Sequence, residues 1–213
     1  MIKPSPAELY THVLRTNFLT FMYAAYRELY GKPLKRNWHH AAMAHAFDTV
    51  LTDERKLCIF MPPRNLKSFI VSVAWPAFLL GRDASLKIVV VSYGEKLAEE
   101  LAYACRRLMM TPFYQELFPG TQIKGRSAID DFQTTRGGGR RATSIGGATT
   151  GVGGEILIID DPIKADAVDS EAARLQALNW FQSSFATRGD DKLGGAQILV
   201  MQRLHEEDLG GIW

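Results

Sequence analysis

The chain has 213 residues, of which 46% are hydrophobic and 23% charged, and a formal net charge of +2. These values predict one globular domain, or one domain with a small extension, and exclude a disordered chain, a collagen-like fibre and a disulfide-stapled miniprotein. Any contact with nucleic acid must come from a local basic patch, since the net charge is small. Two widely spaced cysteines, Cys58 and Cys105, and the lack of a long apolar run or a signal-peptide core favour a soluble intracellular protein without a membrane span.

Two helices are expected at the N-terminus. Apolar residues at spacings of three and four predict the first over residues 6–30, with Gly31 as its end. The second is expected over residues 38–51. We interpret residues 1–52 as a helical appendage in front of the main fold, which covers residues 53–213.

Beyond residue 53, short apolar runs rich in β-branched residues alternate with longer amphipathic stretches. The runs predict buried strands and the stretches predict helices. The strands are expected at residues 57–61, 86–92, 155–160 and 196–202, with helices from about residue 68, at 95–110 and at 170–186. This order predicts an α/β fold with a doubly wound, mainly parallel sheet.

A basic, glycine-rich segment precedes the third expected strand. Residues 137–154 contain eight of the 18 glycines of the chain. Residues 124–141 carry Lys124, Arg126, Arg136, Arg140 and Arg141 against two acidic residues. The simplest interpretation is a flexible, solvated surface excursion.

Residues 61–68, Met-Pro-Pro-Arg-Asn-Leu-Lys-Ser, stand where a strand is expected to end and a helix to begin. A phosphate-binding loop needs helix N-terminal amides, a Lys for the phosphates and a Ser or Thr hydroxyl for Mg²⁺. Lys67 and Ser68 have these identities in this order. Met61 and Leu66 replace the two glycines of the usual pattern, so we predict a left-handed backbone at Leu66, at a cost of roughly 1–3 kcal/mol. Alone, such a Lys-Ser pair is more often accidental.

The third expected strand ends in Asp160 and Asp161, followed by Pro162. In P-loop ATPases the Mg²⁺ ion is held by an acid at such a strand tip, while another residue orients the attacking water. A helix cap or a turn would explain the two acids taken alone. We expect this strand and the loop strand to be neighbours in the sheet, so that the acids and the Lys-Ser loop meet at one edge. Together they predict an ATPase that uses ATP and Mg²⁺.

These motifs resemble the large terminase subunit of tailed bacteriophages, the motor that moves DNA into a capsid. The resemblance spans about residues 37–211. It rests on Pro62-Pro63-Arg64 before Lys67-Ser68, on Thr149-Thr150-Gly151 before residues 156–162 and on residues 202–209, with weaker matches at Trp38-His39, Ser170-Glu171 and Thr187-Arg188. It implies a sheet of the P-loop NTPase, RecA-like (ASCE) type.

The resemblance also implies a role for each matching residue. The residues implied to bind the nucleotide are Pro62, Pro63, Arg64, Asn65, Leu66, Lys67, Ser68, Trp38, His39 and Gln202. Ser68 and Asp160 would hold the metal, and Asp161, Arg64 and Lys67 would be catalytic. Trp38 and His39 stand where the family often builds its adenine pocket, although core packing explains them equally well. Gln202 and Arg203 belong to the motif that couples nucleotide state to movement.

The sequence departs from the family at Val152, where many terminases carry an arginine finger that acts on a neighbouring subunit. The remaining candidates for such a finger are Arg140, Arg141, Arg188 and Arg203. Large terminases usually continue into an RNase H-like nuclease domain. We expect neither this domain nor nuclease activity in the present chain.

By the same resemblance, ATP hydrolysis would drive double-stranded DNA into a viral procapsid in the cytoplasm of the bacterial host. The active form would be a homo-oligomeric ring, a pentamer, that works with a portal protein and a small terminase subunit. Basic residues of segment 124–141 would contact DNA or the next subunit. Two alternatives stay open: a nucleic-acid-dependent ATPase of helicase type, which needs a second RecA-like domain, and a non-hydrolysing DNA- or partner-binding module, which the missing loop glycines favour.

Overall fold

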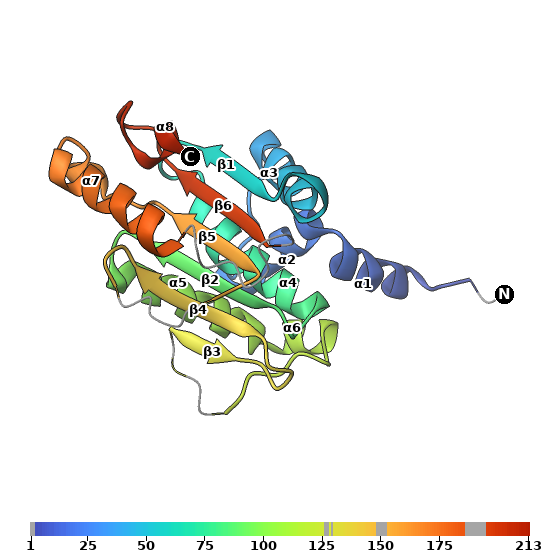
Figure 1. Ribbon diagram of the computed structural model, residues 1–213. Coiled ribbons are helices and arrows are strands. Elements are labelled where there is room, and N and C mark those ends of the chain that lie inside the picture. The colour runs from blue at the N-terminus through green and yellow to red at the C-terminus, as the bar shows by residue number, and fades with distance from the viewer. Residues whose placement is uncertain (1–2, 126–127, 129, 148–152, 186–194) are drawn as a thin grey trace.

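A computed structural model describes residues 3–125, 128, 130–147, 153–185 and 195–213. Its centre is a six-stranded sheet in the order β1-β6-β5-β2-β4-β3 (Figure 1). The strands are β1 Lys56–Phe60, β2 Lys87–Ser92, β3 Asp131–Gln133, β4 Gly139–Ser144, β5 Ile156–Asp160 and β6 Ala196–Met201. All neighbouring pairs are parallel except β3 and β4, which are antiparallel. The expected α/β class with a mainly parallel sheet is confirmed.

One expectation about the sheet is wrong. The strand before the Lys-Ser loop, β1, and the strand that ends in the two aspartates, β5, are not neighbours, because β6 pairs with both of them. Hydrophobic patterning identifies strands, but it does not indicate which strands are neighbours in the sheet. The last strand of the described chain thus inserts between two earlier ones.

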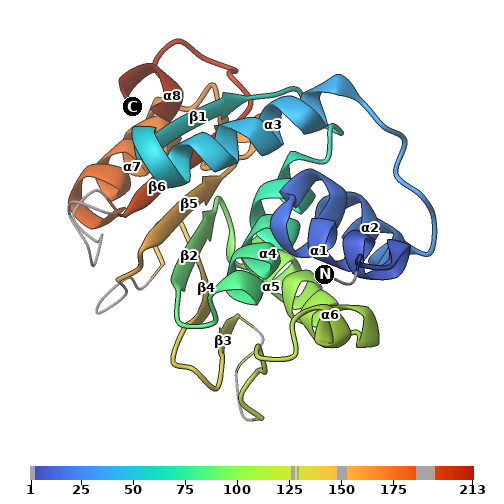
Figure 2. The same ribbon diagram turned by 90° about the vertical axis from the view of Figure 1, so that its right-hand side faces the viewer.

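Helices cover both faces of the sheet (Figure 2). They are α1 Pro6–Thr16, α2 Phe18–Tyr30, α3 Trp38–Thr49, α4 Trp75–Arg82, α5 Glu95–Met109, α6 Pro112–Leu117, α7 Glu171–Trp180 and α8 Leu209–Ile212. Short π-helical segments, Val50–Glu54, Phe69–Ala74 (η2) and Phe181–Phe185, extend α3, lead into α4 and extend α7. Among the described residues, no helix has the length and apolar character needed to cross a bilayer.

The alternation of side chains along the central strands creates two hydrophobic clusters. Ile88 and Val90 of β2 point to the face covered by α2, α4 and α5. Val89 and Val91 point to the other face, where Trp180 of α7 and Leu209 of α8 cover them. Successive residues of a strand face opposite sides, so a strand that is apolar throughout needs helices on both faces.

The first predicted helix, over residues 6–30, is in fact two helices. The chain breaks at Asn17, whose φ of −114° and ψ of 109° are extended. Its side-chain Oδ1 accepts a hydrogen bond from the amide of Thr20 and so caps α2. Gly31 ends α2, as predicted, and has a left-handed backbone with a φ of 68°.

The N-terminal helices share one core with the sheet. The Phe18 and Phe21 rings lie 5.5 and 5.3 Å from the ring of Phe78 in α4. In α3, Phe47 stacks on Trp75 at 4.6 Å. The division of the chain at residue 52 stays a prediction, but the hydrophobic contacts run continuously across it.

The basic, glycine-rich segment contains a strand that the sequence did not suggest. Residues 139–144 pair in parallel with β2 instead of forming a flexible excursion. A Cβ atom on Gly138 would lie 2.4 Å from the carbonyl oxygen of Leu86, and one on Gly139 would lie 2.3 Å from that of Phe132. These glycines therefore allow close backbone approach at the start of β4.

Candidate functional site

The loop after β1 is closed by the side chain of one of its own residues, Asn65. The amide Nδ2 of Asn65 donates to the carbonyl oxygens of Pro62 and Pro63, each at 3.2 Å. Two loop residues have a left-handed backbone, Arg64 with a φ of 64° and Leu66 with a φ of 61°. The conformation predicted for Leu66 is confirmed, and the loop reaches it without the usual glycines.

The loop and the tip of β5 meet across the end of β6. The Nζ atom of Lys67 lies 2.8 Å from Oδ2 of Asp161, and the Lys67 side chain is only 7% exposed. The hydroxyl of Ser68 donates to Oδ1 of Asp160 at 3.1 Å. The convergence of these four side chains, expected from the sequence, is thus present although the two strands are separated by β6.

Asp160 is fully buried at the end of β5. The hydroxyl of Ser72, in segment η2, donates to its Oδ2 at 2.7 Å. Burial raises the pKa of the Asp160 carboxyl to about 6, and the nearby charge of Asp161 adds to the increase, while the bonds from Ser72 and Ser68 and the charge of Lys67 oppose it. A cation placed against this buried carboxylate would stabilise its charged form.

Asp161 follows β5 with a strained, left-handed backbone, at a φ of 49°. Its amide donates to the carbonyl of Val200 in β6 at 2.8 Å, and its carbonyl accepts from the amide of Tyr93, just after β2, at 3.0 Å. These two bonds hold the residue between neighbouring strands. Strain of this kind costs on the order of 1–3 kcal/mol and is concentrated at functional sites.

A cavity of about 210 Å³ adjoins Asp161. Gln202, directly after β6, and Tyr93 also line it. The two strand tips thus present a carboxylate and an amide to the same space. The cavity lies at the C-terminal edge of the parallel strands, where open α/β sheets bind their ligands.

The oxygen donors at this edge fit the Mg²⁺ ion expected from the sequence. Within the described ranges, no group of three or more His, Cys, Asp and Glu side chains could hold a metal by itself. Ser68 and Asp160 supply two oxygen donors within hydrogen-bonding distance of each other. Mg²⁺ is commonly bound by one or two protein oxygens together with substrate phosphates and water.

Arg140 does not fit the role expected for it. Its side chain is fully buried, and both Nε and Nη2 donate to the carbonyl oxygen of Ser72, at 3.2 and 3.1 Å. A side chain without exposed surface cannot reach DNA or a neighbouring subunit, so Arg140 is removed from the finger candidates.

Of the other candidates, Arg141 is 39% exposed, and its Nε donates to the carboxylate of Asp131 at 2.8 Å. Arg188 lies outside the described residues.

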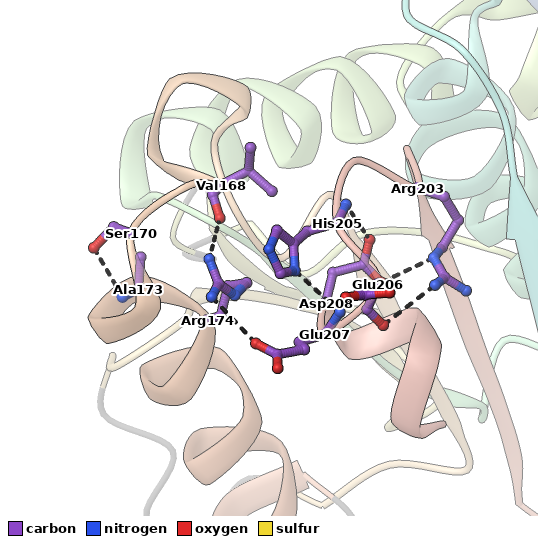
Figure 3. Close-up of polar contacts among 9 residues, drawn as sticks. All are labelled: Val168, Ser170, Ala173, Arg174, Arg203, His205, Glu206, Glu207 and Asp208. Carbon is purple, nitrogen blue, oxygen red and sulfur yellow. Dashed lines mark hydrogen bonds and ion pairs between the residues drawn. The ribbon is translucent and has the colours of Figure 1, made fainter.

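Arg203 is held within its own chain (Figure 3). Its Nε lies 3.0 Å from Oδ1 of Asp208, which is fully buried and accepts the amides of Leu204 and His205 with Oδ2. The Arg203 guanidinium also lies over the ring of Phe60, the last residue of β1, at 5.2 Å. The motif after β6 is therefore a closed loop that contacts the strand leading into the Lys-Ser loop.

A second arginine ties the same loop to α7. Arg174 donates to the carbonyl of Val168 at 2.9 Å and to the carboxylate of Glu207 at 3.3 Å (Figure 3). The Arg174 side chain is largely covered, whereas that of Glu207 is exposed. Residues 203–208 are thus anchored on β1 through Arg203 and on α7 through Arg174.

The two residues expected at an adenine pocket have different surroundings. Trp38, at the start of α3, is 79% exposed, which excludes core packing. His39 is buried, and its Nε2 has no hydrogen-bond partner among the described residues. Helix α3 lies beside β1 (Figure 2). Nucleotide binding by Trp38 and His39 stays a prediction, as it does for Arg64, which is exposed in the loop.

Sequence reasoning missed Ser72 as part of the site. The signal was present, because Ser72 is the one polar residue in the run from Phe69 to Leu80. A hydroxyl in an otherwise apolar helix must bond something buried. Its partner, Asp160, is 88 residues away and could not be identified from the pattern.

The three residues Thr149, Thr150 and Val152 lie outside the described part of the chain.

Comparison with known proteins gives a likeness of fold. No family model matches the chain, and no curated protein matches it. Among solved structures, the crystal structure of the HK97 bacteriophage large terminase is similar, with a TM-score of 0.65 and 14% sequence identity. The match covers 93% of this chain but 40% of that one, so the chain spans well under half of the terminase's length. The chain therefore shares its α/β fold with part of a bacteriophage large terminase.

Proposed function

We propose that the chain is the ATPase part of a DNA-packaging motor of the large-terminase type, with a P-loop NTPase sheet of the RecA-like (ASCE) kind. One observation carries the proposal. Lys67 and Ser68, from the loop after β1, contact Asp161 and Asp160, from the tip of β5. The likeness in fold to the HK97 large terminase supports the class of motor.

Each residue has a distinct task in ATP hydrolysis. Lys67 releases Asp161 and donates to the β- and γ-phosphates, and its ammonium stabilises the charge of the transition state. Asp161, freed from that ion pair, orients the attacking water and accepts its proton. Ser68 and Asp160 would hold Mg²⁺, which would supply charge neutralisation at the phosphate oxygens. Arg64, exposed in the loop, turns toward the γ-phosphate.

The test is steady-state ATP hydrolysis together with ATP binding in two variants. Lys67→Ala should lose binding and turnover, because its ammonium is the main phosphate contact. Asp161→Asn should keep binding and lose about 10²–10⁴-fold in rate, as expected for a missing general base. Asp83→Asn, at an exposed acid between α4 and β2 that accepts the amide of Ser85 away from this edge of the sheet, is the matched control. Equal rates in wild type and Asp161→Asn would contradict the role of Asp161.

The motor is tested by adding double-stranded DNA and by varying the protein concentration. Stimulation by DNA, and specific activity that rises with concentration, are expected of a homo-oligomeric ring, a pentamer, in which a residue acts on the next subunit. The proposed setting is the cytoplasm of a bacterial host, with a portal protein and a small terminase subunit as partners. Strand separation would indicate a helicase, and absence of ATP binding at millimolar concentration with Mg²⁺ would indicate a non-hydrolysing module.

A further inference from the structure

Arg140 is a fully buried cation beneath the helix that follows the Lys-Ser loop. Two of its nitrogens donate to one acceptor, the carbonyl oxygen of Ser72. Burial lowers the pKa of Arg140, while Cys105 and Asp160 act in the opposite direction. Burying a guanidinium is costly unless it is hydrogen-bonded. The location of this charge therefore calls for a structural or functional reason.

The helix itself supplies a reason. In an α-helix, the carbonyl of Ser72 would accept from the amide of residue 76, which is a proline and has no N–H. Pro76 lies in the first turn of α4, directly after the π-helical segment η2 that contains Ser72. Deviations of this kind in a helix are frequent at functional sites. Arg140 supplies two donors to the carbonyl that lacks its α-helical partner.

Ser72 connects this anchor to the site. Its hydroxyl donates to Oδ2 of Asp160 at 2.7 Å, while Oδ1 of the same carboxylate accepts from Ser68. Ser72 has no exposed surface. Its backbone and hydroxyl therefore join Arg140 on β4 to Asp160 on β5 through a single buried residue.

We propose that Arg140 is a positioning residue of the Mg²⁺ site: it holds the Ser72 carbonyl, and thereby fixes the Ser72 hydroxyl and the carboxylate plane of Asp160. The proposal rests on the proposed function, in which Asp160 and Ser68 hold the metal. Partners that orient metal ligands typically change metal affinity by about 10–100-fold when they are removed.

The anchor is tested without nucleotide, by hydrogen–deuterium exchange. Arg140→Met keeps most of the side-chain volume and removes the donors. Exchange in residues 67–82 should become about tenfold faster, the equivalent of one charged hydrogen bond, while exchange in α1 and α7 stays unchanged. Adding Pro76→Ala, which restores a backbone N–H for the Ser72 carbonyl, should bring exchange back toward wild type. Equal acceleration in all helices, or no rescue, would overturn the anchoring role.

The link to the metal is tested by equilibrium binding of a fluorescent ATP analogue during a Mg²⁺ titration. Arg140→Met and Ser72→Ala should each raise the half-saturating Mg²⁺ concentration about 10–100-fold and leave Mg²⁺-free binding unchanged. The Arg140→Met/Pro76→Ala double variant should recover most of the shift. Arg15→Met is the matched control, because Arg15 also donates from its guanidinium to a backbone carbonyl, that of Leu117, outside the site. Where Arg140→Met does not fold, Arg140→Lys should give an intermediate shift.

The outcomes separate the two proposals. Wild-type protein that binds the analogue, together with an unchanged Mg²⁺ requirement in Arg140→Met and Ser72→Ala, would overturn the positioning role alone. Wild-type protein that does not bind the analogue would contradict the proposed function, and with it the link to the metal. The exchange experiment then still decides whether Arg140 anchors Ser72.

Discussion

Two adjacent aspartates at the end of β5 have different surroundings. Asp160 is fully buried and accepts from two serine hydroxyls. Asp161 has a strained backbone, is partly exposed and forms an ion pair with Lys67. One residue type is thus used for two tasks, because the first position belongs to the strand and the second bends out of it toward the cavity.

The burial of Asp160 predicts a pH-dependent stability. Its pKa rises from about 3.8 to about 6 on folding, so the folded state holds the proton more tightly than the unfolded state between these values. Stability therefore falls as the pH rises from about 4 to about 6, by roughly 3 kcal/mol at most, and stays reduced above that range. Asp160→Asn should remove this part of the pH dependence. The measurement is urea denaturation from pH 4 to pH 8 without Mg²⁺.

The comparison of Asp160→Asn with wild type across this pH range tests the direction of the pKa shift. Above pH 6 the asparagine variant should be at least as stable as wild type, because it carries no buried charge, and the difference should shrink toward pH 4. Asp131→Asn, on the edge strand β3 and half-buried, is a control for the loss of a carboxylate outside the site. A constant difference between wild type and Asp160→Asn across the range would contradict the shift.

At the scale of elements, β4 extends the sheet beyond β2 and carries Arg140. Its first residue, Gly139, lies against the backbone of Phe132 in β3. The glycine at the start of β4 allows its backbone to lie close to that of β3. Further along β4, successive side chains alternate between the two faces of the sheet. Arg140 faces inward and Arg141 pairs outward with Asp131. The placement of these two arginines is a property of the strand and not of a loop.

Gly139→Ala should destabilise the protein by about 1–3 kcal/mol, since its Cβ would lie 2.3 Å from a backbone carbonyl oxygen. Because β4 positions Arg140, the Mg²⁺ requirement should rise as well. Gly120→Ala is the control, since a Cβ there meets nothing within 4 Å. Thermal melting measures the stability difference. Equal melting temperatures for the two variants would contradict the packing at the start of β4.

At the scale of the whole molecule, the N-terminal helices and the helix after the Lys-Ser loop belong to one hydrophobic core. Phe47 of α3 stacks on Trp75, which begins α4, and both are buried. Helix α4, which follows the loop, is thus packed against a residue of α3, which precedes the loop. Residues 1–52 and the sheet are expected to unfold together.

Phe47→Ala should lower the free energy of unfolding by about 3–5 kcal/mol, the usual cost of deleting a buried aromatic ring. Unfolding should remain a single transition, with tryptophan fluorescence and circular dichroism giving the same midpoint. Tyr10→Ala, on the exposed side of α1, is the control. Two separate transitions would favour an independent helical appendage instead of one cooperative unit.

Much of the architecture was readable in the sequence alone. Continuous β-branched runs such as residues 86–92 predict strands buried on both faces, and the helices between them predict the parallel sheet. The Lys-Ser pair and the two aspartates were identified, as was the left-handed backbone of Leu66, because each follows from chemistry within a few residues of the chain. The helix break at Asn17 was missed because the apolar spacing continues across it.

Only the tertiary structure decided the order of the strands and the partners of buried polar groups. Three features join residues that are distant in sequence: the insertion of β6 between β1 and β5, the strand formed by residues 139–144, and the contact of Arg140 with Ser72. Local pattern reports which face of an element is buried. It does not report what covers that face, because this depends on how the whole chain packs.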